Sequence, residues 1–564
     1  MTEPRSDRST DAAPRRRSSR RAPAEPSPRR WPILVLLPLL IVAAVAVQRH
    51  QDDQPATVEA VSPDGFVPTA AAPGSASSTW YCAGGTATGQ TTGAAEQTVQ
   101  IANDSDTALT ARVTAFPSQG TSAERDLPVP AHGRVDLAVS SIVTAPYASA
   151  LVEVDGGEVA VSHLLEGPTG KSEAACSSSP SSSWYIPSGT TRAGTSQVLA
   201  VFNPFPSEAV VSVTFEADDG ARSPQDFEAV VVAGQSLTVL DIGKTVTLRD
   251  QLATTVTVRS GRVIVDQIQS ADGTQGTTKS LTVTPGAPKA ASTWWFADGP
   301  AEEGTGTVFY VQNPSDQTAE VELQIRLDDT ATYGQVEPFE VSVSAGRYVA
   351  IDIAGDGRVP TGVGYTAVAQ TKNGVDIIAD RVVSIAAPAP DVGATVTMGS
   401  PVLASRWIVP VGSMTVASSV SVVVTNPSST EPITLTVSTI DDGKVTPLPG
   451  MTGVQVLGGG RGGFDVPTGA KEHQVAVDVS GASLVVVEAK IVFTSGGRAA
   501  ALAVPVAGTN ELTDLGIPVT NPADAVTSDS VPTDSVPDDT SLLPSETIPP
   551  GTEPSGTNPP GTGG

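Results

Sequence analysis

Short runs of alternating apolar and polar residues fill the chain between about residue 77 and residue 510. In the stretch 181–287, for example, runs rich in β-branched residues such as Gln197–Asn203, Ala209–Ala217 and Thr254–Ser260 are each bounded by Gly, Pro, Asp or Ser. Runs of this kind are typical of β-strands that bury one face. No segment after residue 50 keeps a 3.6-residue apolar period over ten residues, so no long helix is expected there. The pattern predicts an all-β protein.

One motif occurs four times: a Trp, an apolar residue two positions later and then a Gly. The four Trp residues are Trp80, Trp184, Trp294 and Trp407. An Asn follows each of them at an expected strand end, and these residues are Asn103, Asn203, Asn313 and Asn426. Seven or eight strands fit into each repeat of about 100 residues, which is typical of an immunoglobulin or fibronectin-like β-sandwich. The spacing predicts four tandem sandwiches, at residues 77–178, 181–287, 291–397 and 404–510.

The spacing inside the motif assigns a role to each Trp. Residues two apart on a strand share a face, and the second residue after the Trp is Ile186, Phe296 or Val409 in three copies. We therefore expect the four Trp side chains to fill the cores rather than to stack on a ligand. The aromatic residue directly after the Trp (Tyr81, Tyr185 or Trp295) should face outward, where it is the better candidate for contact with a neighbour. The Asn residues are expected to form Asx turns that end strands.

The chain contains only two cysteines, Cys82 and Cys176, and both fall in the first repeat. Two cysteines in an exported chain most often pair. The sequence therefore predicts one disulfide, which ties the first strand of the repeat to its exit segment. The alternative is two free thiols.

The two ends of the chain differ from its middle. Residues 1–30 hold nine Arg and almost no large apolar residues, so they are predicted to be a disordered cytoplasmic tail. Residues 31–48 form an apolar segment at the short end of the length that spans a membrane. The preceding Arg excess places the N-terminus inside and the bulk of the chain outside. Residues 49–76 are a linker, and 516–564 are a disordered, acidic tail rich in Pro, Thr and Ser. The alternative for 31–48 is a cleaved signal peptide, which would give a secreted protein.

Charge and motif content exclude several functions. The chain has 33 Lys and Arg against 60 Asp and Glu, a net charge of −27, which would repel nucleic acid. The four His residues show no metal-ligand spacing, and no known catalytic or phosphate-binding motif is present. We therefore expect no catalytic residues, no metal and no cofactor. Paired acids such as Asp218-Asp219, Asp328-Asp329 and Asp441-Asp442 are read as turn residues, with calcium binding at repeat junctions as the alternative.

The repeat motif resembles a known group of proteins. The Trp-led stretch, the Val-x-Val-x-Asn-Pro run and the strand that ends in Asp266 are similar to an uncharacterised actinobacterial family of exported or membrane-anchored β-repeat proteins. The resemblance covers about residues 77–510 and is weakest in the first repeat, where Asp104 replaces the Pro. It implies an envelope location and supplies no functional residue.

These observations predict a non-enzymatic, single-pass envelope protein. It would be anchored in the cytoplasmic membrane by residues 31–48 and would use extracellular β-sandwiches to bind a protein or a wall glycan, or to act as a spacer or scaffold. One alternative is a regulatory or scaffolding subunit of a complex that builds the envelope. A remote alternative is a hydrolase of wall polymers, which would need a pair of carboxylates in a cleft.

Overall fold

The computed structural model describes residues 65–89, 94–300, 304–386, 392–410, 417–441, 443–467 and 476–512, all within one compact unit. These residues form an all-β structure with several sheets, as predicted. Within them, no helix has the length and apolar character needed to cross a membrane. The predicted cytoplasmic tail, transmembrane helix and acidic tail, and most of the predicted linker, lie outside the described residues.

The first repeat consists of two four-stranded sheets with the orders β4-β3-β6-β1 and β5-β2-β7-β8. A single parallel pair, Thr86 with Glu96, links β1 to β2. The elements are β1 (Ser78–Ala87), β2 (Glu96–Asn103), β3 (Leu109–Pro117), β4 (Ala123–Val129), β5 (Gly133–Ala138), η1 (Val139–Ser141), β6 (Ala145–Val154), β7 (Val159–Gly167) and β8 (Gly170–Ala175).

The second repeat has the same two sheets, with the orders β12-β11-β15-β9 and β14-β10-β16-β17, and β13 pairs with β11. Its elements are β9 (Ser183–Ile186), β10 (Thr195–Asn203), β11 (Ala209–Ala217), β12 (Gly220–Arg222), η2 (Gln225–Phe227), β13 (Val230–Val232), β14 (Ser236–Asp241), η3 (Ile242–Lys244), β15 (Leu252–Ser260), β16 (Ile264–Ala271) and β17 (Ser280–Pro285).

The third repeat repeats this order as β18-β23-β20-β21 and β22-β19-β24-β25. Its elements are β18 (Thr293–Gly299), β19 (Thr305–Gln312), β20 (Ala319–Leu327), α2 (Thr330–Tyr333), β21 (Phe339–Val343), β22 (Tyr348–Asp352), α3 (Ile353–Asp356), β23 (Tyr365–Thr371), β24 (Ile378–Ile385) and β25 (Gly393–Met398). In these three repeats the first strand pairs with a later strand of the same repeat: β1 with β6, β9 with β15 and β18 with β23. In the immunoglobulin order, by contrast, the first strand lies beside the second.

The fourth repeat differs in one respect, because β32 runs through both of its sheets. Its first part pairs with β26 and β28, and its second part pairs with β27 and β33. The elements are β26 (Val402–Val409), β27 (Ala417–Thr425), β28 (Ile433–Asp441), β29 (Lys444–Pro447), β30 (Val454–Val456), β31 (Arg461–Val466), β32 (Ala476–Phe493), β33 (Arg498–Leu502), β34 (Val504–Pro505) and β35 (Asn510–Leu512).

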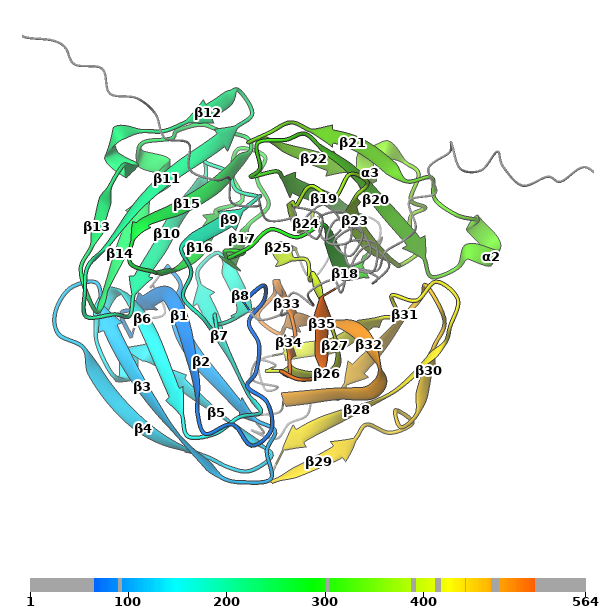
Figure 1. Ribbon diagram of the computed structural model, residues 1–564, viewed down its shortest axis with the longest axis horizontal. Coiled ribbons are helices and arrows are strands. Elements are labelled where there is room, and N and C mark those ends of the chain that lie inside the picture. Colours follow the sequence, from blue (N-terminus) through cyan, green and yellow to red (C-terminus); the bar gives the residue numbers. More distant parts are fainter. Residues whose placement is uncertain are drawn as a thin grey trace, which may run out of the picture. The chain divides into compact units, whose positions relative to one another are not determined.

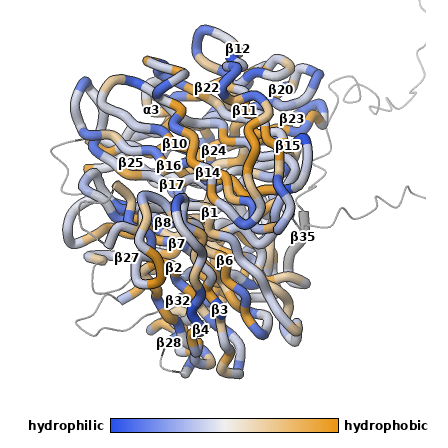
Figure 2. The backbone as a smooth tube through the Cα atoms, turned by 90° about the vertical axis from the view of Figure 1, so that its left-hand side faces the viewer, coloured by the Kyte–Doolittle hydropathy of each residue, from blue (hydrophilic) through white to orange (hydrophobic). Residues whose placement is uncertain are grey.

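Alternation along the strands explains why these segments pair in this way. In β20 every second residue, from Ala319 to Leu327, is buried, and the residues between them are polar and less buried. A period of two places all the apolar side chains on one face of the sheet, where they pack against the second sheet. Figure 2 shows the same division, with apolar stretches inside the sheets and hydrophilic residues at turns such as the one beside β12.

The four motif Trp side chains lie in the cores. Each is at most 1% exposed, and each belongs to a separate hydrophobic cluster together with the alternating residues of its own repeat. In the third repeat, Phe296 adds an edge-on contact with Phe309 at a centroid distance of 5.0 Å. Burying one such indole stabilises a fold by roughly 2–3 kcal/mol or more, so the Trp is the main filler of a sandwich that has few other aromatic residues.

The four Asn residues end the second strand of each repeat with the same bonds. The Asn103 Oδ1 accepts a hydrogen bond from the Ser105 N–H at 3.0 Å, which is an Asx turn. Its Nδ2 donates to the carbonyl oxygens of Thr107 and Pro130. The equivalent Nδ2 bonds of Asn203, Asn313 and Asn426 join the same two loops in the other repeats. One buried amide therefore holds two connections of each sandwich together.

The predicted disulfide is confirmed. Cys82, in β1, is bonded to Cys176, which directly follows β8, across 94 residues of sequence. Both residues are buried in the core of the first repeat. The bond therefore joins the first strand of one sheet to the end of the other.

The four repeats pack on one another around a common centre, as Figure 1 shows. One strand of each repeat forms these contacts: β8 packs on β17, β17 on β25, β25 on β33 and β33 on β8. The residue after each Trp joins the core of the next repeat, because Tyr81 packs in the second core, Tyr185 in the third and Trp295 against residues of the fourth. Ile408 completes the series in the first core. The expected contact with a neighbour is therefore made with the next repeat of the same chain.

The ends of the described chain close this arrangement. Ala70 and Val506 form a parallel bridge, in which the Ala70 N–H donates to the Pro505 carbonyl at 2.9 Å. Beside them, the Arg406 guanidinium of the fourth repeat pairs with Glu158 of the first repeat at 2.5 Å and with the carboxylate of Asp104. The first and fourth repeats are thus joined by backbone, charge and a shared core.

A buried side chain on β16, β24, β32 or β7 binds the backbone three or four residues after the Trp of the preceding repeat. Asp266 accepts a hydrogen bond from the Ala83 N–H at 2.9 Å, Asp380 accepts one from Ser188 and Glu488 accepts one from Ala297. At the closing junction, Ser162 donates to the Pro410 carbonyl instead. These four contacts stand at equivalent places and fix each repeat against the next.

Asp266 gives this junction a pH dependence that can be measured. Burial raises the pKa of its carboxyl to about 7, although the hydrogen bonds from Ala83 and Gly84 act against this rise. Because the folded-state pKa lies above the unfolded value of 3.8, the wild type loses stability as the pH rises from about 4 to about 7. Asp266→Asn removes this titration and keeps the acceptor. We expect the stability of the variant relative to the wild type to increase by roughly 1–3 kcal/mol between pH 5 and pH 8.

Urea unfolding of both proteins at the two pH values measures this change. Asp155→Asn serves as the control, since that residue is exposed. An equal stability difference at both pH values would show that Asp266 keeps its charge in the folded state.

Candidate functional site

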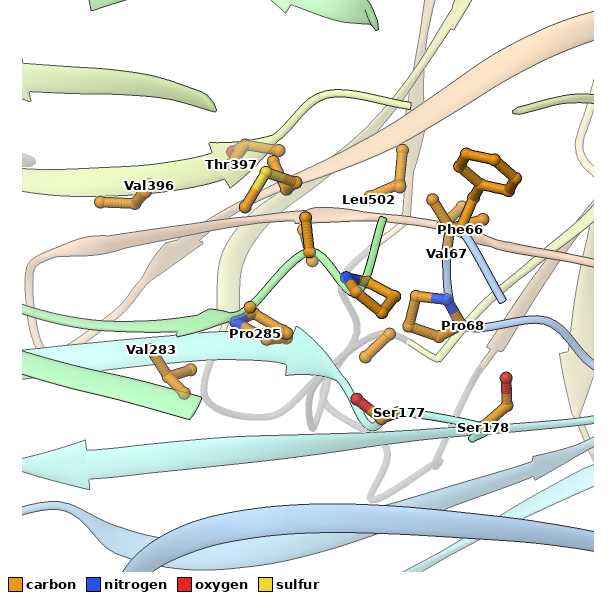
Figure 3. Close-up of a pocket in the computed structure, with 18 of the residues that line it drawn as sticks. Phe66, Val67, Pro68, Ser177, Ser178, Val283, Pro285, Val396, Thr397 and Leu502 are labelled. Carbon is orange, nitrogen blue, oxygen red and sulfur yellow. The ribbon is translucent and has the colours of Figure 1, made fainter. Parts of the chain in front are cut away.

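The centre of the four repeats contains a small apolar cavity. Its volume is about 60 Å³, and it is lined by β8, β17, β25 and β33, one strand from each repeat, including Val283, Val396 and Leu502. Phe66 and Pro68 of the N-terminal segment also line it (Figure 3). A cavity of this size can hold a few water molecules, whereas ligand sites measure roughly 300–1,000 Å³. We therefore interpret it as a packing space of the central core rather than as a ligand site.

A larger groove lies beside the N-terminal segment, and we call it the Trp80 groove. Its volume is about 600 Å³, and it is lined by segments of three repeats, including Ala507, and by residues 65–71 at the start of the described part of the chain. Many of its lining residues carry hydroxyl groups, among them Thr69, Ser78, Thr79, Ser179, Ser181 and Ser182. Arg262 and Lys289 also line it, and none of the described lining residues is Asp or Glu. In a chain with a net charge of −27, a large groove without acids is unusual.

Two buried polar atoms of this groove have no hydrogen-bond partner among the described residues. They are the Nε1 of Trp80 and the Oγ of Ser78. In the other repeats the indole N–H donates to a buried carbonyl, that of Val263, Ile377 or Val485, at 2.7–3.1 Å. Leaving a buried donor unsatisfied costs about 1–3 kcal/mol. Trp80 is therefore the one motif Trp whose buried N–H has no carbonyl partner among the described residues.

The path of the N-terminal segment explains this difference. In the second and third repeats, the residue three before the Trp pairs with the strand that supplies the carbonyl, as Ser181 does with Val263 and Ala291 with Ile377. In the first repeat the corresponding strand is β7, and residues 70–72 lie beside its start instead. The Glu158 N–H, directly before β7, donates to the Ala71 carbonyl at 2.8 Å. The pairing seen in the second and third repeats is thus replaced by the segment that carries the Ala70–Val506 bridge, and the Trp80 groove lies beside this bridge.

The two cations of the groove have different surroundings. The Lys289 ammonium lies over the Phe66 ring, 4.8 Å from its centroid, which is a cation–π contact. Arg262 is exposed and forms no ion pair or hydrogen bond with any described residue. An Arg without an acidic partner has all its donors available to an anion.

The other residues singled out from the sequence have structural roles. Asp219 pairs with Arg222 and Arg249, Asp328 pairs with Arg461, and the Asp329 side chain caps α2. Within the described part of the chain, no group of three or more His, Cys, Asp or Glu side chains is placed to hold a metal ion. The structure therefore brings together none of the paired acids as a site, and Asp442 lies outside the described residues.

No pattern in the sequence predicts the Trp80 groove. The four Trp residues are equivalent in sequence because the motif around them is the same, and no sequence pattern singles out Arg262. The only available signal was that the first repeat departs from the others after its Trp, with a longer first loop and with Asp104 in place of Pro.

A family model of unknown function, DUF5719, matches residues 166–278. This match extends from the end of β7 to the residues before β17, and thus includes most of the second repeat. It agrees with the resemblance to an uncharacterised family. No curated protein matches the chain.

Solved structures show only weak similarity. One is described as a tetra-tandem repeat in the extending region of a large adhesion protein; it shares 13% identity, with 77% of this chain and 99% of that chain covered, at a TM-score of 0.10. Another is an α-L-rhamnosidase of Streptomyces avermitilis in complex with L-rhamnose, with 10% identity, 76% of this chain and 57% of that chain covered, and a TM-score of 0.11. At these scores neither similarity carries an argument about fold or function.

Proposed function

We propose that this protein is a non-enzymatic, single-pass envelope protein that presents four β-sandwich repeats outside the cytoplasmic membrane, where the Trp80 groove binds a partner. The observation that carries the proposal is the unpartnered indole N–H of Trp80 in a groove of about 600 Å³. Binding sites combine a concave surface with a few well-placed polar groups. The apolar segment 31–48 supports the anchor, and the disulfide supports an oxidising location.

The contacts between repeats favour a role in binding a partner over a role as a spacer. A spacer needs only repeats that follow one another, whereas here the first and fourth repeats share a core and a charged cluster. Such closure holds the walls of the groove, which come from three repeats, in one arrangement. Rigid walls lower the entropic cost of binding. The groove also lacks an acidic pair among its described lining residues, so we propose no hydrolytic activity for it.

Two matched variants test the role of Trp80. Trp80→Phe removes an indole N–H that has no partner in the described part of the chain, whereas Trp184→Phe removes one that donates to the Val263 carbonyl at 3.0 Å. We expect Trp184→Phe to lower the stability by about 1 kcal/mol more than Trp80→Phe does. Only Trp80→Phe should weaken retention of the full-length protein, in detergent micelles, on isolated cell-wall polymers.

Sedimentation with wall material and with membrane extract measures retention, and urea unfolding measures stability. Equal retention of the two variants would remove the groove from the proposed function. Failure of the wild type to bind wall material, together with stable co-purification of membrane enzymes, would favour a subunit of an envelope-building complex instead.

A further inference from the structure

A second hollow adjoins the Trp80 groove, and we call it the Phe205 hollow. Its volume is about 510 Å³, and its lining includes Phe205, Pro206, Glu208 and Arg262. Arg262 also lines the Trp80 groove, so it stands between the two. Together they offer an extended site with a central cation, hydroxyl groups on one side and an aromatic ring on the other.

The ring of Phe205 is not required by the turn in which it lies. Phe205 follows Asn203 by two residues, and its N–H donates to the Asn203 Oδ1 at 3.1 Å. The residue at this place in the other three repeats is a Ser: Ser105, Ser315 or Ser428. A Ser makes the same backbone bond, and the hydroxyls of Ser105 and Ser315 add a second bond at 2.7 Å. The second repeat instead carries a Phe that is 40% exposed.

The charge of Arg262 is also specific to the second repeat. Arg262 directly precedes Val263, whose carbonyl receives the Trp184 N–H. The residues at this place in the other repeats are Glu158, Asp376 and Leu484. Glu158 is bound by Arg406, which serves the closure of the chain. Arg262 has no such partner among the described residues, so the fold does not account for its charge.

We propose that the Trp80 groove and the Phe205 hollow together bind an anionic glycan, a chain of sugar rings that bears carboxylate or phosphate groups. Arg262 binds the anionic group through its planar set of donors. The Trp80 N–H and the Ser and Thr hydroxyls bond sugar hydroxyls, which satisfies the two buried atoms that lack partners. The exposed ring of Phe205 provides an apolar face for a sugar ring. This inference rests on the proposed binding function and names its ligand.

The lining favours a glycan over an acidic peptide. A peptide carboxylate would also pair with Arg262, but a peptide offers few hydroxyls to the row of Ser and Thr side chains in the Trp80 groove. Glu208, which also lines the Phe205 hollow, repels a second acid there and accepts a hydrogen bond from a sugar hydroxyl. We therefore expect the anionic group to lie near Arg262 and an uncharged part of the glycan to lie near Phe205.

Binding of defined polymers to the full-length protein in detergent micelles tests the proposal. The probes are oligogalacturonate, which carries carboxylates, a phosphomannan, which carries phosphates, dextran as a neutral glycan and poly-glutamate as an acidic peptide. We expect at least one of the two anionic glycans to bind with a Kd about tenfold or more below those of dextran and poly-glutamate. Affinity should fall with rising salt. Whichever anionic glycan binds more tightly identifies the acidic group.

Two variants and one control locate the site. Arg262→Ala and Phe205→Ser should each weaken the binding by about tenfold, and the serine restores the residue found at this turn in the other repeats. Arg259→Ala removes an equal charge from a neighbouring exposed residue that lines neither hollow, and it should leave the Kd unchanged. Unchanged melting temperatures of the variants would show that the fold is intact.

The outcomes separate this inference from the proposed function. Equal Kd values for wild type, Arg262→Ala and Phe205→Ser would overturn the assigned site, and tighter binding of poly-glutamate would overturn the assigned ligand. In both cases retention on wall material that depends on Trp80 could still stand. Loss of retention on all wall material would instead overturn the proposed function itself.

Discussion

Replacement of Glu488 by glutamine is expected to lower the free energy of unfolding by about 3–5 kcal/mol. The Glu488 carboxylate is 2.7 Å from the Arg381 Nη2, and both side chains are 1% exposed. It also accepts the Ala297 N–H, so it joins the fourth repeat to the third. The amide cannot neutralise the buried guanidinium, which then keeps only the more distant charge of Asp298. A buried charge that loses its directly bonded partner is strongly destabilised. Urea unfolding of the two proteins at pH 7 measures the loss.

An exposed ion pair provides the comparison. Arg112 and Asp126 are 2.9 Å apart, with side chains 51% and 56% exposed. Solvent screens such a pair, so Asp126→Asn should lower the free energy of unfolding far less than Glu488→Gln does. The double substitution Arg381→Met with Glu488→Leu should recover most of the stability lost in Glu488→Gln, because it leaves no unpaired charge. A loss of less than 1 kcal/mol in Glu488→Gln would show that water reaches the pair.

Removal of the disulfide is the second large effect that we expect. Cys82→Ala with Cys176→Ala should lower the free energy of unfolding by about 4 kcal/mol. The bond closes a loop across 94 residues, and in the chain-entropy model so long a loop strongly restricts the unfolded chain. The urea concentration at the midpoint of unfolding should therefore be lower for the double alanine variant than for the wild type with its disulfide intact.

Reducing agent distinguishes the bond from the packing of its residues. Both Cys side chains are buried in the first core, so the alanine variant also loses some packing. Unfolding in the presence of dithiothreitol should lower the midpoint of the wild type and leave that of the double alanine variant unchanged. If dithiothreitol changed neither protein, the bond would contribute nothing to stability.

Both variants act on the closed arrangement of repeats, but at different places. Glu488 lies at the junction of the third and fourth repeats, whereas the disulfide lies within the first repeat, whose core also holds Ile408 and Val504 of the fourth repeat. The first repeat has to supply a stable surface for the closing contacts. This need accounts for a covalent bond in that repeat alone.

Much of the local structure could be predicted from the sequence. A period of two along the strands and the turns at Asn203 and Asn313 depend on residues close in sequence, so their physics is visible in a short window. The disulfide was predictable because only one pairing of two cysteines exists. The inward position of each Trp followed from the apolar residue two positions later, and the structure buries all four.

What the sequence by itself determined is therefore the all-β class, the fourfold repeat, the Asn turns and the single disulfide, since each rests on a local pattern or on a count. The tertiary structure alone decided how the repeats close and where a ligand can bind. The same motif surrounds Trp80 and Trp184, yet of these two only the Trp80 N–H lacks a partner among the described residues. The reason is that residues 70–72 lie beside the start of β7, where the second repeat instead pairs Ser181 with Val263. Such differences arise from contacts across hundreds of residues, and no local pattern records them.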